Sequence, residues 1–387
     1  MTSIRNSSLA LIVFLGIMLA GCGKDTPATP DTGGSGTGGG GGVTYTGTVA
    51  TYTEIPIPTI DIPNLIIPNL GAFYVTNRGA YVHVQNTKKQ LWSVYKYHNG
   101  GAIPWSNYSP DFPLTSFIPS SFANEKDMEL SFYWNGNDSG KYGMFNMNNG
   151  SPSFNYTVPM PPNGPGGFSN VIPAKKGFQR LWGIIGNEIW SESAVVSPKK
   201  FDKIAEIQLP LGSFVTKFFA DPENETDLWC ATENRLYRVS TVGSTPGSKG
   251  GIQNNWDFSS LGAGTINAII SVDKTIVIQY GNRIYRQEGT SFKSLGTLKT
   301  PAGATSSIAT NGSTIVASDG NYYSFSTGLW KSYIGTGVSL SPADMKKYDD
   351  LKTICSAGFP IGVINGSGDG PVYILTLDKL VKITPKL

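Results

Sequence analysis

The amino-acid sequence predicts an all-β fold on the basis of three observations. First, 47 glycines and 25 prolines are spread over 387 residues, so turns are frequent. Second, aromatic residues make up 11% of the chain and charged residues only 15%, a balance more typical of extracytoplasmic β proteins than of helical ones. Third, one short pattern recurs from residue 43 onward. Together these features predict one large β domain over residues 43–387.

The recurring pattern is an apolar strand, a tight polar turn and a second strand that begins with an aromatic residue. Its clearest copy spans residues 228–239, and the next spans 275–286. Asn and Gly occur in the turns because two-residue hairpins need positive φ, which these residues tolerate. The second strands of successive copies are marked by Trp92, Tyr142, Trp190, Tyr237, Tyr285, Tyr323 and Val381.

The markers are spaced by about 48 residues, which is typical of a four-stranded β-propeller blade. We therefore predict a propeller of seven blades, although the weaker copies also fit six or eight. The pattern Leu-Trp-x-x-Thr-x-x-x-Leu-Tyr-Arg at 228–238 resembles the propeller repeats of bacterial sensor ectodomains. The resemblance implies the fold and leaves the function open.

Two further elements complete the predicted domain. The last repeat leaves no room for an outer strand in the last blade, and the segment 43–53, rich in Thr, Val and Tyr, is predicted to supply it. Such closure removes free sheet edges. Ser341, Pro342 and Asp344 predict a short inserted helix that runs to about residue 350, with the serine as its N-cap.

The N-terminus has the features of a secretion signal. Arg5 precedes an apolar run from Leu9 to Leu19, which is too short to span a membrane as a mature helix. The run ends in Leu19-Ala20-Gly21-Cys22, which resembles the lipobox of bacterial lipoproteins. The resemblance implies that residues 1–21 are removed and that Cys22 carries acyl chains that anchor the protein to a membrane. An ordinary signal peptide or a membrane helix is the alternative.

Residues 22–42 are predicted to form a flexible tether. Gly23-Lys24-Asp25 resembles the lysine and acidic residues that follow the cysteine in surface lipoproteins of the Bacteroidota. The glycine-rich remainder cannot bury enough apolar surface to fold, and a flexible chain of this length reaches about 25 Å. The sequence thus predicts an outer-membrane lipoprotein on the cell surface, with the periplasmic face as the alternative.

The composition argues against several classes of function. A net charge of +3 provides no basic footprint for nucleic acid. Two histidines, His83 and His98, are too few for a histidine-rich metal site, and the sequence contains no cofactor motif in a convincing context. Cys230 and Cys355 are predicted to be unbridged hydrophobic residues in core strands.

Paired carboxylates would be the remaining route to catalysis, as in glycosidases. Asp138, Asp227 and Asp273 each lie beside a predicted turn, which favours a solvated position over a catalytic one. The acidic run 221–227 contains possible calcium ligands, but a solvated loop is the simpler interpretation.

The best binding candidates are aromatic and amide side chains in predicted loops. Aromatic faces stack on sugar rings and amides bond hydroxyl groups, while exposed aromatics also form hot spots for protein partners. Packing between blades is the alternative for the rings. The candidates are Trp105, Asn107, Tyr108, Trp134, Asn135, Asn137 and Asp138.

These features predict a membrane-anchored, non-enzymatic binding module. It would be either an accessory subunit of an outer-membrane assembly or a lipoprotein that captures a glycan. The alternative is a hydrolase or lyase that acts on glycans through carboxylates in the propeller channel. The expected partners are the membrane, an outer-membrane protein or a glycan; no nucleic acid, cofactor or metal is expected.

Overall fold

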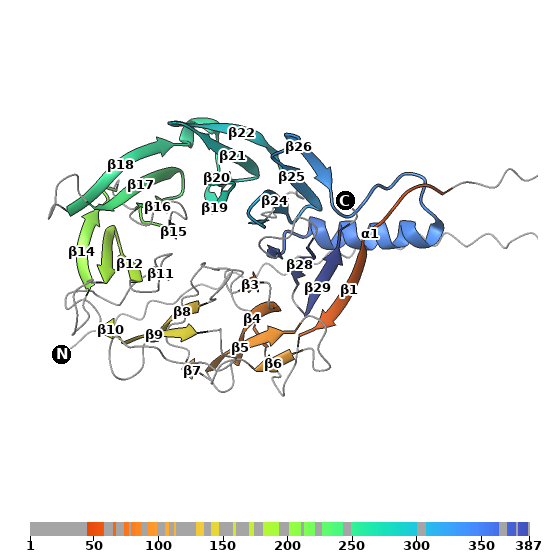
Figure 1. Ribbon diagram of the computed structural model, residues 1–387, viewed down its shortest axis with the longest axis horizontal. Helices are drawn as coiled ribbons and strands as arrows, with labels where there is room; N and C mark the ends of the chain where they lie inside the picture. The colour runs from red at the N-terminus through yellow and green to blue at the C-terminus, as the bar shows by residue number, and fades with distance from the viewer. Residues whose placement is uncertain are drawn as a thin grey trace, which may run out of the picture. The chain divides into compact units, whose positions relative to one another are not determined.

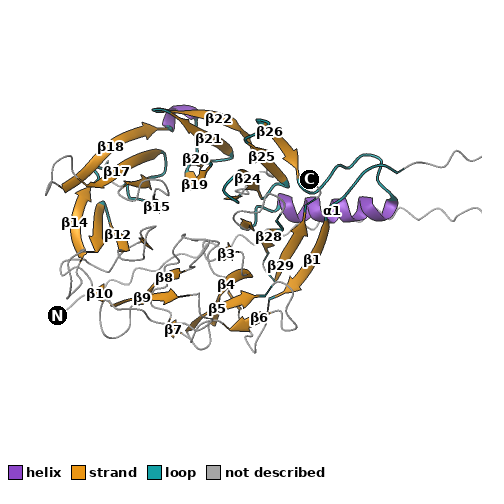
Figure 2. Cartoon of the chain, in the orientation of Figure 1, coloured by secondary structure: helices purple, strands orange, loops and turns teal. Residues whose placement is uncertain are grey.

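Strands dominate the computed structural model of the protein (Figures 1 and 2). Its chain divides into two compact units after Thr44, and every described residue belongs to the second. The predicted lipidation site, Cys22, therefore lies outside the described residues. The structure describes residues 45–57, 65–66, 73–76, 79–86, 91–98, 105–107, 112–113, 129–134, 141–146, 158–159, 170–173, 181–192, 201–209, 213–220, 227–242, 249–299, 307–363, 370–376 and 378–385.

The described strands form seven antiparallel sheets, numbered here in chain order. Sheet 1 contains β2 (Leu65–Ile66), β3 (Phe73–Thr76), β4 (Gly79–Asn86), β5 (Leu91–Tyr97), β6 (Trp105–Asn107) and β7 (Phe112–Pro113). Sheet 2 contains β8 (Glu129–Trp134), β9 (Lys141–Asn146) and β10 (Val158–Pro159). Sheet 3 contains β11 (Asn170–Pro173), β12 (Leu181–Ile185), β13 (Glu188–Glu192) and β14 (Phe201–Glu206).

The other four sheets have four strands each. Sheet 4 contains β15 (Lys217–Ala220), β16 (Asp227–Ala231), β17 (Arg235–Val242) and β18 (Lys249–Asp257). Sheet 5 contains β19 (Ile266–Val272), β20 (Thr275–Tyr280), β21 (Arg283–Glu288) and β22 (Ser291–Thr297). Sheet 6 contains β23 (Ile308–Thr310), β24 (Thr314–Ala317), β25 (Asn321–Ser324) and β26 (Leu329–Ser332). Sheet 7 contains β27 (Ile361–Val363), β28 (Val372–Leu375), β29 (Lys379–Thr384) and β1 (Thr51–Pro56).

Successive sheets contact each other through their inner strands. The contacts run from β8 to β11, β15, β19, β23, β27 and β3, so sheets 2 to 7 follow one another and sheet 7 meets sheet 1. In Figure 1 the first strand of sheets 3 to 5 lies nearest the middle, and the last strand of sheets 3 to 6 lies at the rim. The seven sequence markers fall on equivalent strands, β5, β9, β13, β17, β21, β25 and β29, which confirms the predicted hairpin repeat.

The N-terminal strand completes the last sheet, as predicted. β1 pairs with β29 in antiparallel register, with Ile55 opposite Leu380. The strand begins at Thr51, later than the predicted residue 43. The preceding segment instead contacts the loop before α1, where Val49 forms a bridge with Gly335.

A second repeat appears in the hydrogen bonds that follow each outer strand. In sheets 3 to 7 a buried apolar residue donates its backbone N–H to a carbonyl in the central hairpin turn of the same sheet. Because each bond satisfies a buried backbone group, it fixes both the turn and the end of the outer strand. The pairs are Ile207 with Asn187, Phe258 with Asn234, Leu298 with Asn282, Tyr333 with Gly320, and Ile57 with Asp378.

Tryptophans on the outer strands join neighbouring sheets. The indole N–H of Trp256 on β18 donates to the carbonyl of Thr290, just before β22, at 2.7 Å. The indole of Trp330 on β26 donates to the carbonyl of Leu295 on β22 at 2.8 Å. Each bond lets a large apolar ring pack between two sheets while its polar atom is satisfied.

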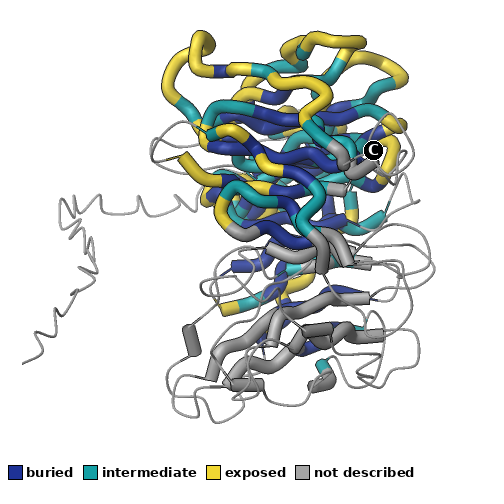
Figure 3. Tube along the Cα trace, turned by 90° about the vertical axis from the view of Figure 1, so that its left-hand side faces the viewer, coloured by how far each residue is buried: buried dark blue, intermediate teal, exposed yellow. Residues whose placement is uncertain are grey.

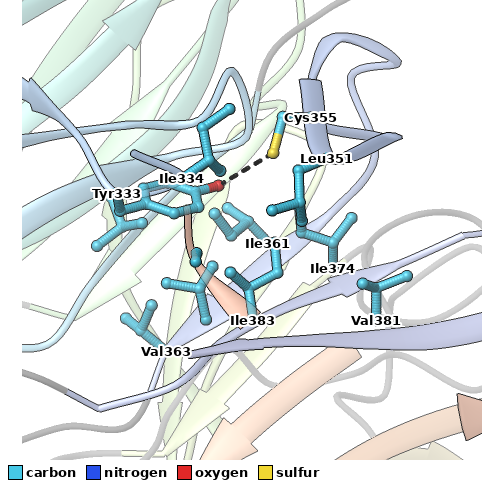
Figure 4. Close-up of a cluster of buried hydrophobic side chains, with 12 residues drawn as sticks. Tyr333, Ile334, Leu351, Cys355, Ile361, Val363, Ile374, Val381 and Ile383 are labelled. Atoms are coloured by element: carbon cyan, nitrogen blue, oxygen red, sulfur yellow. Dashed lines mark hydrogen bonds between the residues drawn. The ribbon is translucent and has the colours of Figure 1, made fainter. Parts of the chain in front are cut away.

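The best-described core lies between sheets 6 and 7 and the α-helix α1 (Pro342–Ser356). Figure 4 shows Tyr333, Leu351 and Cys355 meeting apolar side chains of sheet 7, with the tyrosine hydroxyl 3.7 Å from the thiol. Figure 3 shows buried stretches in the interior of the unit, and the exposed residues include much of the outer strands β18 and β22 as well as turns. Among the described residues, no helix has the length and hydropathy needed to cross a membrane.

Both described cysteines are unbridged and buried, as predicted. Cys230 lies in β16, but Cys355 lies in α1, so its predicted strand is wrong. The helix continues beyond residue 350 because Leu351 and Cys355, one turn apart, present a buried face to the sheets. The Ser341 side chain caps the helix by accepting the N–H of Asp344 at 3.2 Å, as predicted.

Candidate functional site

The predicted aromatic and amide candidates are only partly described. Trp105 and Asn107 lie in β6 and Trp134 ends β8, so these three are in strands rather than in the predicted loops. Pairing with the neighbouring strand, Tyr97 opposite Trp105, draws this segment into the sheet. Tyr108, Asn135, Asn137 and Asp138 lie outside the described residues.

Trp105 packs between sheets 1 and 7. Its indole N–H donates to the carbonyl of Pro56 at 2.8 Å, and its ring centroid lies 5.5 Å from that of Tyr97. The ring also packs against the buried side chains of Ile55 and Leu380. These contacts show that Trp105 packs between two sheets, which the sequence analysis gave as the alternative to a binding role.

Asp227 is not the solvated turn residue that the sequence predicted. It begins β16, its side chain is 6% exposed, and Oδ2 accepts from both Nε and Nη2 of Arg238 at 2.6 Å. The guanidinium also lies 5.8 Å from the centroid of the Trp229 ring. A buried carboxylate needs such a partner to offset its desolvation, so Asp227 has a structural role. Asp273 does lie in an exposed turn, with φ of 47°.

A small pocket lies where the β16–β17 turn meets the segment before β15. It has a volume of about 140 Å³ and is lined by Ser213, Phe214, Thr232, Glu233 and Asn234. Phe214 is 61% exposed, although its neighbour Val215 is buried in the core between sheets 3 and 4. The pocket therefore has a mostly polar lining, with one exposed aromatic residue, Phe214, among the residues that form it. We call it the Phe214 pocket.

Backbone hydrogen bonds hold both walls of the Phe214 pocket. Thr216 donates its N–H to the carbonyl of Ala231 at 2.7 Å, which fixes the segment that carries Phe214. The hydroxyl of the buried Thr232 accepts the N–H of Arg235 at 3.2 Å and closes the turn. The Glu233 carbonyl accepts from Ile266 of sheet 5 at 2.7 Å. A site held this way on a β scaffold is preorganised.

The repeat shows how this turn differs from its equivalents. In sheet 3 the turn is Gly186-Asn187, and the Asn187 amide donates to the carbonyl of Ile207 at 3.1 Å. In sheet 4 the equivalent residues are Glu233 and Asn234, and within the described ranges the Asn234 side chain makes no such bond to its own sheet. Its amide is thus available to the pocket.

Sequence reasoning missed Phe214 because an isolated Ser-Phe-Val segment predicts a buried strand as readily as an exposed ring. One signal was present: Glu233 occupies the turn position that holds Gly186 and Gly281 in the neighbouring copies. Within the described ranges, no group of three His, Cys, Asp or Glu side chains is close enough to hold a metal ion.

Comparisons with known proteins yielded likenesses to solved structures, of which two are described here. No family model and no curated protein matches the chain. A Bacteroides uniformis protein provisionally assigned as a 6-phosphogluconolactonase aligns over 71% of this chain and 87% of its own, with 11% identity and a TM-score of 0.47. Citrobacter koseri AztD aligns over 58% and 69%, with 14% identity and a TM-score of 0.36. Likenesses this weak assign no activity to the chain.

Proposed function

We propose that this chain is a membrane-anchored binding module that captures a glycan at the Phe214 pocket. The observation that carries the proposal is Phe214 itself, an aromatic ring 61% exposed beside a rigid polar turn. What favours a ligand is the combination of this aromatic residue with a few fixed polar groups in one pocket, because binding pockets join aromatic side chains to a small number of well-placed polar groups.

The lining of the pocket fits the chemistry of a sugar ring. The face of Phe214 can stack on the apolar C–H face of the ring, while the Ser213 hydroxyl, the Glu233 carboxylate and the Asn234 amide can bond its hydroxyl groups. A volume of about 140 Å³ is well below the roughly 300 Å³ at which pockets for drug-sized ligands begin. The pocket would therefore take one terminal sugar residue of a longer glycan.

We propose a closed propeller of seven blades as the scaffold, with sheets 1 and 2 meeting to complete the ring. The inner-strand contacts that link sheets 2 to 7 and sheet 1 in order support it, as does β1 as the outer strand of sheet 7. The seven inner strands, β3, β8, β11, β15, β19, β23 and β27, carry two charged residues, Glu129 and Lys217. A largely uncharged channel suits a scaffold for binding.

The anchor of the module is proposed from the lipobox. Acylation of Cys22 would hold the chain on the outer membrane, and Lys24 and Asp25 favour export to the cell surface. Replacing Cys22 with Ser should release the protein from membranes in a flotation assay. Loss of the protein on protease treatment of intact cells would support surface exposure, whereas protection would place it on the periplasmic face.

Glycan capture is tested by titrating the protein with a panel of neutral and acidic oligosaccharides. Phe214→Ala should weaken binding by at least about tenfold, as expected when an aromatic hot spot is removed. Leu329→Ala is the matched control, because Leu329 is 59% exposed on β26 of another sheet and should leave the affinity unchanged. Equal affinities of both variants and wild type would refute the assignment of the site.

The same preparation tests two alternatives. Release of reducing ends from a bound glycan that is abolished by Glu233→Gln would indicate a hydrolase, although both glycosidase mechanisms use two carboxylates and the pocket lining supplies one. Recovery of a stoichiometric membrane barrel from mildly solubilised membranes would make the chain an accessory subunit instead.

A further inference from the structure

Exposed apolar side chains gather at the point where the tether joins the folded unit. Among the described residues, Tyr45 is 52% exposed, Val338 is 71% exposed and Met345 is 36% exposed. Tyr45 is the first described residue, Val338 lies in the loop before α1, and Met345 lies in the first turns of α1. We call these three residues the Val338 face.

Hydrogen bonds and a close contact hold the segment after Tyr45 against the loop that carries Val338. Thr46 and Gly47 both donate their N–H groups to the carbonyl of Ser339, at 3.1 and 3.0 Å. A Cβ on Gly47 would lie 2.2 Å from the carbonyl oxygen of Val338, so only glycine permits this approach. Met345 follows in α1, where its N–H donates to the carbonyl of the N-cap residue Ser341 at 2.8 Å.

The exposure of Val338 is imposed by the backbone. Ser339 has a φ of 54°, a strained conformation for a residue other than glycine. The next residue, Leu340, is 6% exposed and anchors the loop in the interior. The loop therefore holds an apolar side chain out in water between two fixed points, which is the arrangement expected of a contact surface.

The N-terminal half of α1 extends from the sheets beside this loop. The buried residues of the helix, Leu351 and Cys355, both lie in its second half. Figure 1 shows α1 reaching outward next to the chain that leads into β1. The helix carries three lysines and three aspartates, and Lys346 and Lys347 pair with Asp350 and Asp344. The Val338 face is therefore apolar, and the helix beside it carries no net charge.

We propose that the Val338 face rests on the membrane to which Cys22 anchors the chain, an inference that depends on the proposed lipid anchor. The tether joins the folded unit at this face and reaches only about 25 Å. The face is thus the part of the domain held nearest to the bilayer. Tyrosine is favoured at such interfaces because its ring is apolar and its hydroxyl polar. Contact between the Val338 face and the bilayer should not depend on anionic lipid, because α1 carries no net charge.

The contact is tested with the mature lipidated chain reconstituted in vesicles. Val338→Cys and Met345→Cys are labelled with an environment-sensitive fluorophore, which the buried native Cys230 and Cys355 do not take up. Phe214→Cys is the control, since its exposure is similar and β15, which follows it, lies far across the unit from α1 in Figure 1. Circular dichroism verifies that each variant is folded.

The expected result is a blue-shifted emission and at least about twofold less quenching by iodide at positions 338 and 345 than at 214. The protection should be the same in phosphatidylcholine vesicles and in vesicles that also contain phosphatidylglycerol. Equal quenching at all three positions in protein that floats with the vesicles would overturn the contact while leaving the anchor intact. Failure to float would instead overturn the proposed anchor and, with it, this inference. Protection that rises with the ratio of protein to lipid would place a second copy on this face and refute a membrane contact.

Discussion

Gly296 provides a sharp test of how neighbouring sheets are joined. It lies on β22 with a φ of 138°, at a point where the register with β21 shifts by one residue. An added Cβ would lie 2.9 Å from Nε1 of Trp330, whose N–H donates to the adjacent carbonyl of Leu295 at 2.8 Å. Gly296→Ala should therefore strain the backbone and also displace the indole from its bond.

The magnitude follows from these two effects. A non-glycine residue at this φ costs about 1 kcal/mol or slightly more, and loss of the indole hydrogen bond costs about another 1 kcal/mol. Gly296→Ala should thus lower the free energy of unfolding by about 2 kcal/mol. Trp330→Phe should cost about 1 kcal/mol for the hydrogen bond, plus a smaller packing loss.

The double variant separates the two effects. The phenylalanine ring has no Nε1 and is smaller, so an alanine side chain at position 296 meets less resistance, and only the backbone strain should remain. The cost of Gly296→Ala should then fall by about 1 kcal/mol in the Trp330→Phe background. Urea unfolding of all four proteins, followed by far-ultraviolet circular dichroism, measures this coupling. Effects that add within about 0.5 kcal/mol would refute the contact.

Three further predictions follow from single side chains. Trp105→Phe should lower the free energy of unfolding by about 1 kcal/mol in urea and leave glycan affinity unchanged; a loss of affinity would return Trp105 to the binding site. The pKa of Asp344 lies below its ordinary value of 3.8, chiefly because the Ser341 hydroxyl donates to it. The stabilisation of the folded state by the ionised Asp344 is therefore complete above pH 3.8 and is lost as the pH falls through the pKa of the folded protein. Ser341→Ala should raise the pKa of Asp344, measured by NMR titration of its carboxyl group. An unchanged pKa would contradict the hydrogen bond from Ser341. Burial raises the pKa of both Cys230 and Cys355, the latter to about 12. Neither thiol should therefore react with a disulfide reagent at pH 8 until urea unfolds the chain. Rapid labelling of the native protein would refute the burial of the two cysteines.

The repeated hairpin could be predicted because its code is local. A glycine in the left-handed region, as at Gly186 and Gly281, sets the turn, and the aromatic marker sets the phase of the strand that follows. The pairing of β1 with β29 was also predictable, because a strand-rich segment at one end matched a missing strand at the other.

Other parts of the fold depend on tertiary contacts that the sequence does not display. The segment before Thr51 has strand propensity, yet its partners are the loop residues from Ile334 to Ser339. Cys355 lies in an apolar stretch that suits a strand, but its burial one turn after Leu351 keeps it in the helix. In both segments the conformation is set by the residues that the segment packs against and not by its own strand propensity.

The candidate site was harder to predict because exposure is itself a tertiary property. Trp105 is of a residue type that is common in binding sites, and only its hydrogen bond to the carbonyl of Pro56 reveals a packing role. Phe214 is of a residue type that is common in protein cores, and only the structure shows that its ring is exposed to solvent. Residue type alone therefore predicted neither the packing of Trp105 nor the exposure of Phe214.

The repeat itself helps to separate structural from functional departures. Arg286 is the sheet 5 equivalent of Arg238, but the position of Asp227 is taken there by Thr275. That departure is compensated only in part: the Arg286 guanidinium lies 4.7 Å from the centroid of Phe325 and its Nη2 donates to Thr275 at 3.4 Å, but its Nε is buried and has no hydrogen-bond partner among the described residues. At Glu233 and Asn234 the turn departs from its equivalents beside an exposed ring, and within the described part of the chain no contact of the Asn234 amide replaces the bond that Asn187 makes. The two departures differ in their surroundings: the unpartnered Nε of Arg286 is buried, whereas the Asn234 amide lies on a partly exposed turn where a molecule from solution can reach it. Accessibility is therefore the reason that we propose the Phe214 pocket, rather than the charged side chains of the strands, as the binding site.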